Sequence, residues 1–307
     1  MADSLPPSST APVPAPAAGY RSVFRPGLFA GQVAWVTGGG SGIGRCTAHE
    51  LAALGAQVVV SGRDAAKLER VAGEILHDGG LCSTVTFDIR DEDAVKAGVA
   101  QVLARHGRVH ALVNNAGGQF PAPMLALSKR GFEAVVANNL TGGFLMMREV
   151  FTQCMQMHGG AIVNMTAMFR NGMPGMAHSG AARAGMSNLT QSAAVEWSSF
   201  GVRVNAVAPG WVASSGMDTY AGAVRSMIPT LRQHVPLRRL ATEAEVSGAI
   251  VFLLSPAAAY ITGVTVDIDG GAPLVNPLFP SVEHASSLPF EGFHRAVTPE
   301  VLKDGAP

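Results

Sequence analysis

Short apolar runs rich in β-branched residues alternate with longer segments of helical spacing from Gly31 to Gly271. The apolar runs predict seven strands, over residues 32–37, 57–61, 83–88, 111–114, 161–166, 203–208 and 264–268. They are continuously apolar, which is typical of strands buried on both faces. Because each crossover must return the chain to the same edge of the sheet, strict alternation of strand and helix predicts one α/β domain with a doubly wound parallel sheet.

The composition argues against several classes of protein. Apolar residues make up 48% of the 307 residues, and 22 basic residues balance 22 acidic ones. Predominant disorder, nucleic-acid binding and binding to an anionic membrane surface are therefore not expected. The three cysteines are far apart, which favours a reducing compartment and predicts neither a disulfide scaffold nor a metal site. No run of about eighteen apolar residues occurs, so no membrane span is expected.

The two ends of the chain lie outside the alternating region. Residues 1–27 begin with a segment rich in Pro, Ala and Ser, which predicts a flexible tail and not a secretory signal. Residues 28–272 form the predicted domain, and residues 273–307 form a C-terminal extension. The chain does not end in a peroxisomal Ser-Lys-Leu address, so a cytoplasmic location is expected. Three aromatic residues of the extension are candidates for packing across a subunit boundary: Phe279, Phe290 and Phe293.

A glycine-rich turn follows the first predicted strand. Residues 37–44 read TGGGSGIG and open the first helix. Glycines here allow a tight turn and let backbone N–H groups reach a pyrophosphate at the helix N-terminus. A second strand ends about 20 residues later, as in dinucleotide-binding units. The turn therefore predicts a dinucleotide site that contains Gly38, Ser41, Gly42, Ile43 and Gly44.

The end of the second predicted strand indicates which cofactor binds. Arg63 follows Ser61 and Gly62 there, and an arginine accommodates the 2′-phosphate of NADP(H). We therefore expect NADP(H), with Arg63 as the phosphate partner and Ser61 assisting it. We interpret Asp64 as the N-cap of the next helix. In the alternative, Arg63 is solvated and Asp64 binds the ribose of NAD(H).

Two further strand ends supply candidate cofactor residues, because ligands of such sheets bind beyond the carboxyl ends of the strands. Asp88 ends the third predicted strand, where it either accepts from the adenine amino group or caps a helix. Asn114, Ala116 and Gly117 end the fourth, where small residues let a cofactor lie against the backbone.

These motifs resemble the short-chain dehydrogenase/reductase family. The match runs through TGGGSGIG (37–44), NNAG (114–117), NNL (138–140), APGWV (208–212) and DGG (269–271), and it covers roughly residues 30–272. The resemblance implies a Rossmann-type domain with a seven-stranded parallel sheet, assembly as a homotetramer or homodimer, and proton transfer by an Asn, a Ser and a Tyr-x-x-x-Lys pair. It also implies cofactor contacts from Ile89, Pro209, Gly210 and Val212.

The expected proton-transfer residues are largely replaced. Asn139 stands at the position of the catalytic Asn, where it would organise the helix and a water, but Ser179 replaces the Tyr and Arg183 the Lys. Thr166 offers the hydroxyl nearest to the position of the Ser. A serine hydroxyl is a far weaker acid than a phenol, so carbonyl–alcohol exchange is disfavoured. Arginine stays charged and can hold the ribose of the nicotinamide.

The segment HSGAARAG (178–185) resembles the peroxisomal trans-2-enoyl-CoA reductases, and the related 2,4-dienoyl-CoA reductases also lack the usual tyrosine. This resemblance implies NADPH-dependent reduction of the C2=C3 double bond of a trans-2-enoyl-CoA, an acyl thioester. Thr166 and Ser179 would donate hydrogen bonds to the thioester oxygen as charge develops there. The candidate substrate residues are Gln119, Phe120 and Tyr220, the last in a segment (211–239) that forms a lid in the family.

Two alternatives stay open. A carbonyl reductase or alcohol dehydrogenase with an atypical proton donor, Tyr220 or water, would oxidise a secondary alcohol with NADP⁺. A non-catalytic NADP(H)-binding protein would leave every enoyl-CoA unchanged. Of the two remaining tyrosines, Tyr20 is assigned to the tail and Tyr260 to packing before the last strand.

Overall fold

The computed structural model describes residues 19–276, 278 and 280–303, so the first 18 residues of the predicted tail and Phe279 lie outside the described residues. A single parallel sheet of seven strands forms the centre, in the order β3-β2-β1-β4-β5-β6-β7. This confirms the predicted doubly wound, Rossmann-type α/β domain. The strands are β1 (Val33–Thr37), β2 (Gln57–Gly62), β3 (Leu81–Thr86), β4 (Ala111–Asn114), β5 (Gly160–Met165), β6 (Val202–Pro209) and β7 (Thr265–Ile268).

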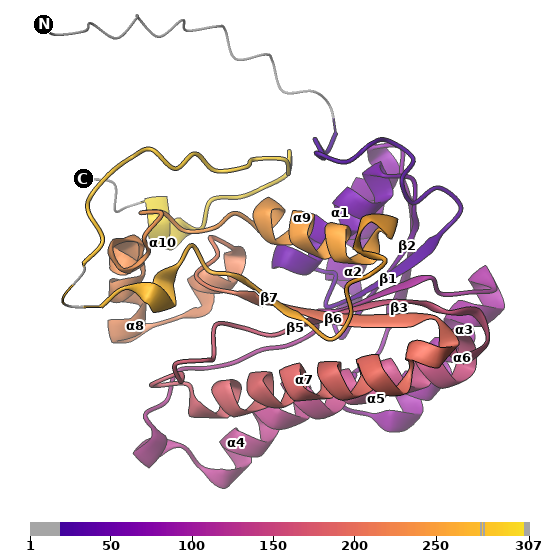
Figure 1. Ribbon diagram of the computed structural model, residues 1–307, viewed down its shortest axis with the longest axis horizontal. Helices are drawn as coiled ribbons and strands as arrows, with labels where there is room; N and C mark the ends of the chain where they lie inside the picture. The colour runs from indigo at the N-terminus through magenta and orange to yellow at the C-terminus, as the bar shows by residue number, and fades with distance from the viewer. Residues whose placement is uncertain (1–18, 277, 279, 304–307) are drawn as a thin grey trace, which may run out of the picture.

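Helices cover both faces of the sheet (Figure 1). One face packs against α1 (Gly42–Ala53), α2 (Ala65–His77) and α9 (Glu243–Leu254), through residues such as Leu51, Val71 and Ile250. The other face packs against α3 (Glu92–His106), α5 (Gly142–Val150) and α7 (Ala177–Glu196), with α4 (Lys129–Val136) beside α7. The remaining α-helices in the described residues are α6 (Gln156–His158), α8 (Gly222–Met227) and α10 (Glu300–Lys303). Within the described ranges, no helix combines the length and the apolar character that a membrane span needs.

Side-chain caps start the helices that follow β2 and β3. Asp64 accepts a hydrogen bond from the backbone N–H of Lys67 at 3.1 Å, and Asp91 accepts one from Ala94 at 3.0 Å. The first contact confirms the cap predicted for α2, and it engages one carboxylate oxygen of Asp64. The second contact shows that Asp91, and not Asp88, caps α3. Since β3 ends at Thr86, two residues earlier than predicted, Asp88 lies in the loop after the strand.

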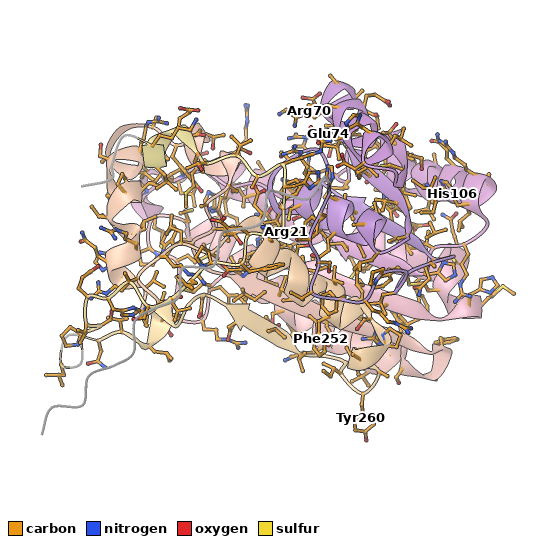
Figure 2. All side chains as sticks on the ribbon, turned by 90° about the horizontal axis from the view of Figure 1, so that it is seen from above. Arg21, Arg70, Glu74, His106, Phe252 and Tyr260 are labelled. Atoms are coloured by element: carbon orange, nitrogen blue, oxygen red, sulfur yellow. The ribbon has the colours of Figure 1, made fainter. Side chains whose placement is uncertain are left out.

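The assignments of Tyr20 and Tyr260 are both wrong. Tyr20 donates to Glu50 Oε2 at 3.1 Å and Ser22 donates to Glu50 Oε1 at 2.8 Å, so residues assigned to the tail belong to the folded domain. Burial raises the pKa of both the Tyr20 phenol and the Glu50 carboxyl. Tyr260, which we expected to pack inside, is fully exposed in the loop before β7 and projects from the surface (Figure 2).

The C-terminal extension folds back onto α1 and α9 of its own chain. Phe293 is 4% exposed, and its ring lies 5.8 Å from that of Tyr20 and 5.1 Å from that of His49. The Arg45 guanidinium lies 5.0 Å above the same ring. Phe290 packs beside it and donates its backbone N–H to Glu245. Phe293 is therefore buried inside its own chain and not at a subunit boundary as predicted, whereas for the half-buried Phe290 a subunit contact stays a prediction.

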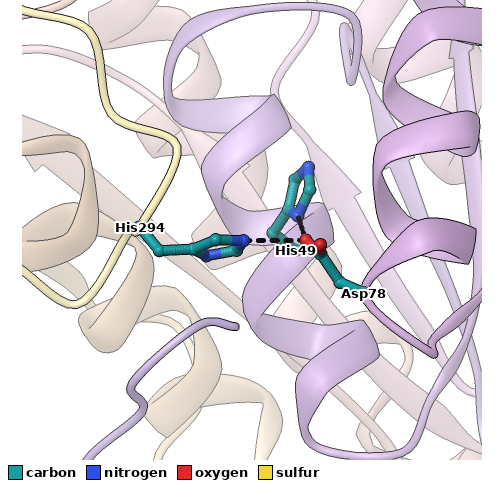
Figure 3. A group of neighbouring side chains, drawn as sticks. All are labelled: His49, Asp78 and His294. Carbon is teal, nitrogen blue, oxygen red and sulfur yellow. Dashed lines mark hydrogen bonds and ion pairs between the residues drawn. The ribbon is translucent and has the colours of Figure 1, made fainter. Parts of the chain in front are cut away.

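A polar cluster next to Phe293 anchors the extension (Figure 3). His294 Nε2 lies 2.8 Å and His49 Nδ1 3.5 Å from Asp78 Oδ2. The ligand atoms of these three residues lie within 4.8 Å of one another, as in a metal site. However, Arg295 donates to both oxygens of Asp78, at 2.5 and 2.8 Å, and hydrogen bonds from Arg295 and His294 hold the pKa of Asp78 at about 2. We therefore assign the cluster to anchoring.

Candidate active site

A cavity of about 620 Å³ opens at the carboxyl ends of β1, β4, β5 and β6. A pocket of about 420 Å³ adjoins it beyond β2 and β3, and the two share Gly38, Ser41, Ala116 and Gly117. This is the edge of the sheet at which the sequence predicts the cofactor. Twelve of the predicted cofactor residues line the cavity or the pocket: Gly38, Ser41, Ile43, Arg63, Asp88, Ile89, Ala116, Gly117, Arg183, Pro209, Gly210 and Val212.

The glycine-rich turn brings backbone close to backbone. Gly38 has a φ of +64°, and a methyl group there would lie 2.9 Å from Ala116 Cα. Gly44 lines neither pocket, and a methyl group there would lie 2.5 Å from the Gly38 carbonyl oxygen, so it permits close packing of α1 on the turn. Gly42, with a φ of +56°, is the first residue of α1. Ser41, the N-cap of α1, lines both the cavity and the adjoining pocket, which together form the groove. The N-terminus of α1 therefore lies at the shared part of the groove, where it could bind a pyrophosphate.

Two cations line the pocket beyond β2. Arg63, the predicted phosphate partner, lines this pocket with an exposed side chain, and Lys67 lines the same pocket from the first turn of α2. Sequence reasoning missed Lys67. The signal was its position three residues after the cap Asp64, because the first turn of that helix lies next to the end of β2. Asp88 also lines this pocket, but its carboxylate accepts from Arg90, with Nη2 at 2.5 Å and the backbone N–H at 3.0 Å. The Arg90 hydrogen bonds keep the pKa of Asp88 below its ordinary value.

The side chains of Ser61 and Asn114 are buried in the interior and do not reach the groove. The side-chain contacts to the cofactor predicted for these two residues are therefore wrong. Because side chains alternate along β2, Ser61 lies on the same buried face as Val59, where its hydroxyl accepts from Trp35 Nε1 at 2.9 Å. Asn114 Nδ2 donates to the Gly143 carbonyl at 2.7 Å and thus joins β4 to α5. Asn115 lines the cavity instead.

Arg183 is buried on α7 with unsatisfied hydrogen-bonding capacity. Its Nη1 donates to the Met165 carbonyl at 2.6 Å, whereas its Nε is buried without a partner. Burial lowers the pKa of Arg183 to about 10, so the side chain is still a cation at neutral pH. Its Nη2 lies against Gly117, because a methyl group there would be 2.8 Å from it. A buried guanidinium with spare donors beside the cavity fits the ribose hydroxyls of a nicotinamide nucleotide.

The hydroxyl protons of Thr166 and Ser179 are directed away from the cavity. Thr166 Oγ1 donates to the Val207 carbonyl at 2.8 Å, which extends the pairing of β5 with β6. Ser179 is fully buried, and its Oγ donates to Gln119 Oε1 at 2.6 Å. The structure therefore does not support the predicted role of either hydroxyl as a direct donor to the thioester oxygen.

Gln119 connects the buried helix to the lid. Its Nε2 donates to the Tyr220 hydroxyl at 3.1 Å, and both residues line the cavity. Asn139, in a π-helical turn (Ala137–Thr141), holds the preceding Gly118 by accepting from its N–H at 2.8 Å and donating to its carbonyl at 2.9 Å. Phe120 was predicted to contact the substrate, but it does not line the cavity. Its ring packs edge-on against His178, with the ring centroids 4.6 Å apart.

Comparison with known proteins identifies the family. The family model described as enoyl-(acyl carrier protein) reductase matches residues 38–273. The chain belongs to the short-chain dehydrogenase/reductase family. It is 35% identical to peroxisomal 2,4-dienoyl-CoA reductase of Danio rerio over 82% of this chain and 85% of the relative. It is 39% identical to 3-oxoacyl-[acyl-carrier-protein] reductase of Synechocystis, over 78% and 96% respectively.

Among solved structures, the chain resembles a citronellol catabolism dehydrogenase of Pseudomonas aeruginosa PAO1. The two are 60% identical, with a TM-score of 0.75, and the match covers 82% of this chain and 99% of that one. Our chain is therefore a short-chain dehydrogenase/reductase and an oxidoreductase. The match to the family model ends at residue 273, so nearly all of the C-terminal extension lies outside it.

A buried carboxyl group adjoins the glycine-rich turn of this family. Glu243 is 9% exposed at the start of α9, and a methyl group at Gly42 would lie 3.9 Å from its Oε1. Burial raises the pKa of Glu243 from 4.5 to about 7. The folded state therefore holds the proton more tightly than the unfolded state. Its contribution to stability is complete below about pH 4.5 and is lost as the pH rises through 7.

Glu243→Gln is expected to stabilise the protein at pH 8 by about 2–3 kcal/mol and to have no effect at pH 4.5, because the amide imitates the protonated carboxyl. Urea unfolding at the two pH values measures the difference. Glu133→Gln is the matched control, since Glu133 is exposed on α4. A Glu243→Gln variant that is equally or less stable than the wild type at pH 8 contradicts this prediction.

Proposed function

We propose that this protein uses NADP(H) to reduce the C2=C3 double bond of a trans-2-enoyl-CoA. The observation that carries the proposal is the replacement of the tyrosine and lysine expected on α7 by the buried Ser179 and Arg183. Without a phenol and an amine at these positions, the usual acid–base pair for carbonyl reduction is lost. A 2,4-dienoyl-CoA, named for the Danio rerio relative, is likewise an acyl thioester with a conjugated double bond.

The residues of the groove suit this reaction. NADPH supplies a hydride to C3 when it is bound. Arg183 would hold the ribose hydroxyls with its spare donors, and Gly117 leaves room for the nicotinamide beside it. Negative charge then develops on the thioester oxygen, where a hydrogen-bond donor that lines the cavity would stabilise it. Adaptable thioethers suit an acyl chain, and six methionines line the cavity: Met165, Met168, Met173, Met176, Met217 and Met227.

The preference for NADP(H) is supported by the two cations beyond β2. Arg63→Ala is expected to raise the KM for NADPH by about tenfold or more, and Lys67→Ala to raise it less, because each removes a charged contact to the 2′-phosphate. The KM for NADH should stay within about twofold in both variants. Arg130→Ala, at an exposed position on α4, is the control. Equal effects on NADPH and NADH would refute the assignment of Arg63.

A dehydrogenase or carbonyl reductase is the second candidate. The name of the Pseudomonas aeruginosa neighbour, at 60% identity, favours it, as does that of the Synechocystis relative. In this candidate Tyr220 replaces the missing phenol of α7, and the enzyme oxidises a secondary alcohol with NADP⁺. Binding of NADP(H) without catalysis is the third candidate, from another functional class.

One substrate panel separates the candidates. NADPH oxidation is measured with crotonyl-CoA, a medium-chain trans-2-enoyl-CoA, a 2,4-dienoyl-CoA and acetoacetyl-CoA. We expect turnover of the medium-chain enoyl-CoA and little turnover of acetoacetyl-CoA. Rapid reduction of acetoacetyl-CoA alone would support the second candidate, and NADPH binding without any oxidation the third.

Assembly and location belong to the same proposal. A homotetramer or homodimer is typical of the family, and we propose one of these for this chain, in the cytoplasm. Light scattering of the purified full-length chain determines the mass of the assembly, and the mass of a monomer would contradict the proposed oligomer. Fractionation of the source cells tests the cytoplasmic location.

A further inference from the structure

Tyr220 is fixed at the cavity from two sides. Its hydroxyl accepts from Gln119 Nε2 at 3.1 Å. Two residues earlier, Asp218 accepts from the backbone N–H groups of Glu300 and Val301 at 3.1 and 3.0 Å, at the start of α10. The ring also packs partly against the apolar cluster of the lid, which includes Val301. The segment that carries Tyr220 is therefore attached both to the loop after β4 and to the C-terminal extension.

The hydrogen bonds of Gln119 determine how the phenol is oriented. Its Oε1 already accepts the proton of Ser179, at 2.6 Å, so the amide nitrogen is the end that faces Tyr220. Because the Tyr220 oxygen accepts this bond, its own proton is not used between the two residues. The phenol proton is then available to a group in the cavity, which Tyr220 lines.

We propose that Tyr220 is the proton donor of this site and that Gln119 is the positioning residue that orients it. The inference rests on the proposed reduction of an enoyl thioester. A phenol is a much stronger acid than the aliphatic hydroxyl of Ser179, and it lies in the cavity where Ser179 does not. Ser179 contributes through Gln119, by holding the amide in one orientation.

The proton-transfer step balances as follows. When hydride adds to C3, the π bond between C2 and C3 breaks, and its electron pair moves onto C2 and the thioester oxygen. The O–H bond of Tyr220 then breaks, its proton forms a C–H bond at C2, and water returns a proton to the phenolate. The sum consumes one NADPH and one proton and yields NADP⁺ and the saturated acyl thioester.

Tyr220→Phe tests the donor role. We expect kcat for a medium-chain enoyl-CoA to fall about 100-fold, with the Kd for NADPH, measured by fluorescence, unchanged. Tyr260→Phe, at a fully exposed tyrosine, is the matched control and should retain the wild-type kcat. A Tyr220→Phe kcat within twofold of the wild type would overturn the inference and leave the proposed function intact. A wild-type enzyme that reduces no enoyl thioester would overturn both.

A double-mutant cycle tests the positioning role. Gln119→Ala should lower kcat about tenfold on its own and have no further effect when Tyr220 is already Phe, because Gln119 acts through the phenol. Gln119→Glu should also lower kcat although the shape is conserved, because a carboxylate accepts the phenol proton. Additive losses in the cycle, or a Gln119→Glu variant with wild-type kcat, would overturn the positioning role. Unchanged NADPH affinity shows that each variant is folded.

Discussion

Arg183→Met is expected to weaken NADPH binding by about 100- to 1000-fold while leaving the unliganded protein as stable as the wild type or slightly more stable. The loss corresponds to two hydrogen bonds from a charged donor at about 1.5–2 kcal/mol each, the lower part of the usual range for such bonds. The expectation for the stability of the unliganded protein follows from burial, because Nε of Arg183 has no partner and the guanidinium is desolvated. Replacing such a buried charge by an apolar side chain of similar length is often neutral or stabilising.

Arg203→Met provides the matched control with the opposite expectation. Arg203 is also partly buried, but it donates to three backbone carbonyls, those of Leu253, Leu254 and Ser255. Its replacement should destabilise the protein and leave NADPH affinity unchanged. Fluorescence titration and urea unfolding measure the two quantities for both variants. Wild-type NADPH affinity in Arg183→Met would contradict the ribose assignment.

Phe293→Ala is expected to destabilise the anchored extension by about 3–4 kcal/mol, because it removes a buried ring and leaves a cavity. If the extension then detaches while the domain stays folded, protection from hydrogen exchange should fall at Arg21, whose backbone N–H pairs with the Gly292 carbonyl. Exchange measured by mass spectrometry, together with urea unfolding, distinguishes local from global loss.

Leu288→Ala is the control for Phe293→Ala. Leu288 belongs to the same extension and is 83% exposed, so its replacement should change stability by less than about 0.5 kcal/mol. Similar exchange and unfolding in Phe293→Ala and the wild type would show that the extension is not anchored at this ring.

Local patterns were sufficient to predict the sheet and the glycine-rich turn. The apolar runs identified all seven strands, of which β1, β2, β4, β5 and β6 are buried along nearly their whole length and the edge strands β3 and β7 are partly exposed. The cap at Asp64 was visible as a short polar side chain before helical spacing. Errors at strand ends had larger consequences. Alternation along β2 turns the side chain of Ser61 into the interior although this residue stands near the end of its strand. The strand β3 ends two residues early, which leaves Asp88 in a loop beside Arg90.

The arrangement of the site depends on contacts between distant residues, which no local pattern shows. Ser179 and Gln119 are 60 residues apart in the sequence, and Gln119 and Tyr220 are 101 apart. For this reason Ser179 was predicted to contact the substrate directly, whereas the structure places Gln119 between Ser179 and Tyr220. Likewise, Arg295 and Asp78 are 217 residues apart, so the anchoring of the extension could not be read from the sequence.

The position of the transferred hydrogen tests the proposed reaction most directly. The full-length protein is incubated with NADPH deuterated at C4 of the nicotinamide and an equimolar mixture of a medium-chain trans-2-enoyl-CoA and acetoacetyl-CoA. Mass spectrometry of the products then locates the label. We expect deuterium at C3 of the saturated acyl-CoA and none in 3-hydroxybutyryl-CoA. Deuterium at the carbinol carbon of 3-hydroxybutyryl-CoA, with the enoyl-CoA recovered unchanged, would contradict the proposed function.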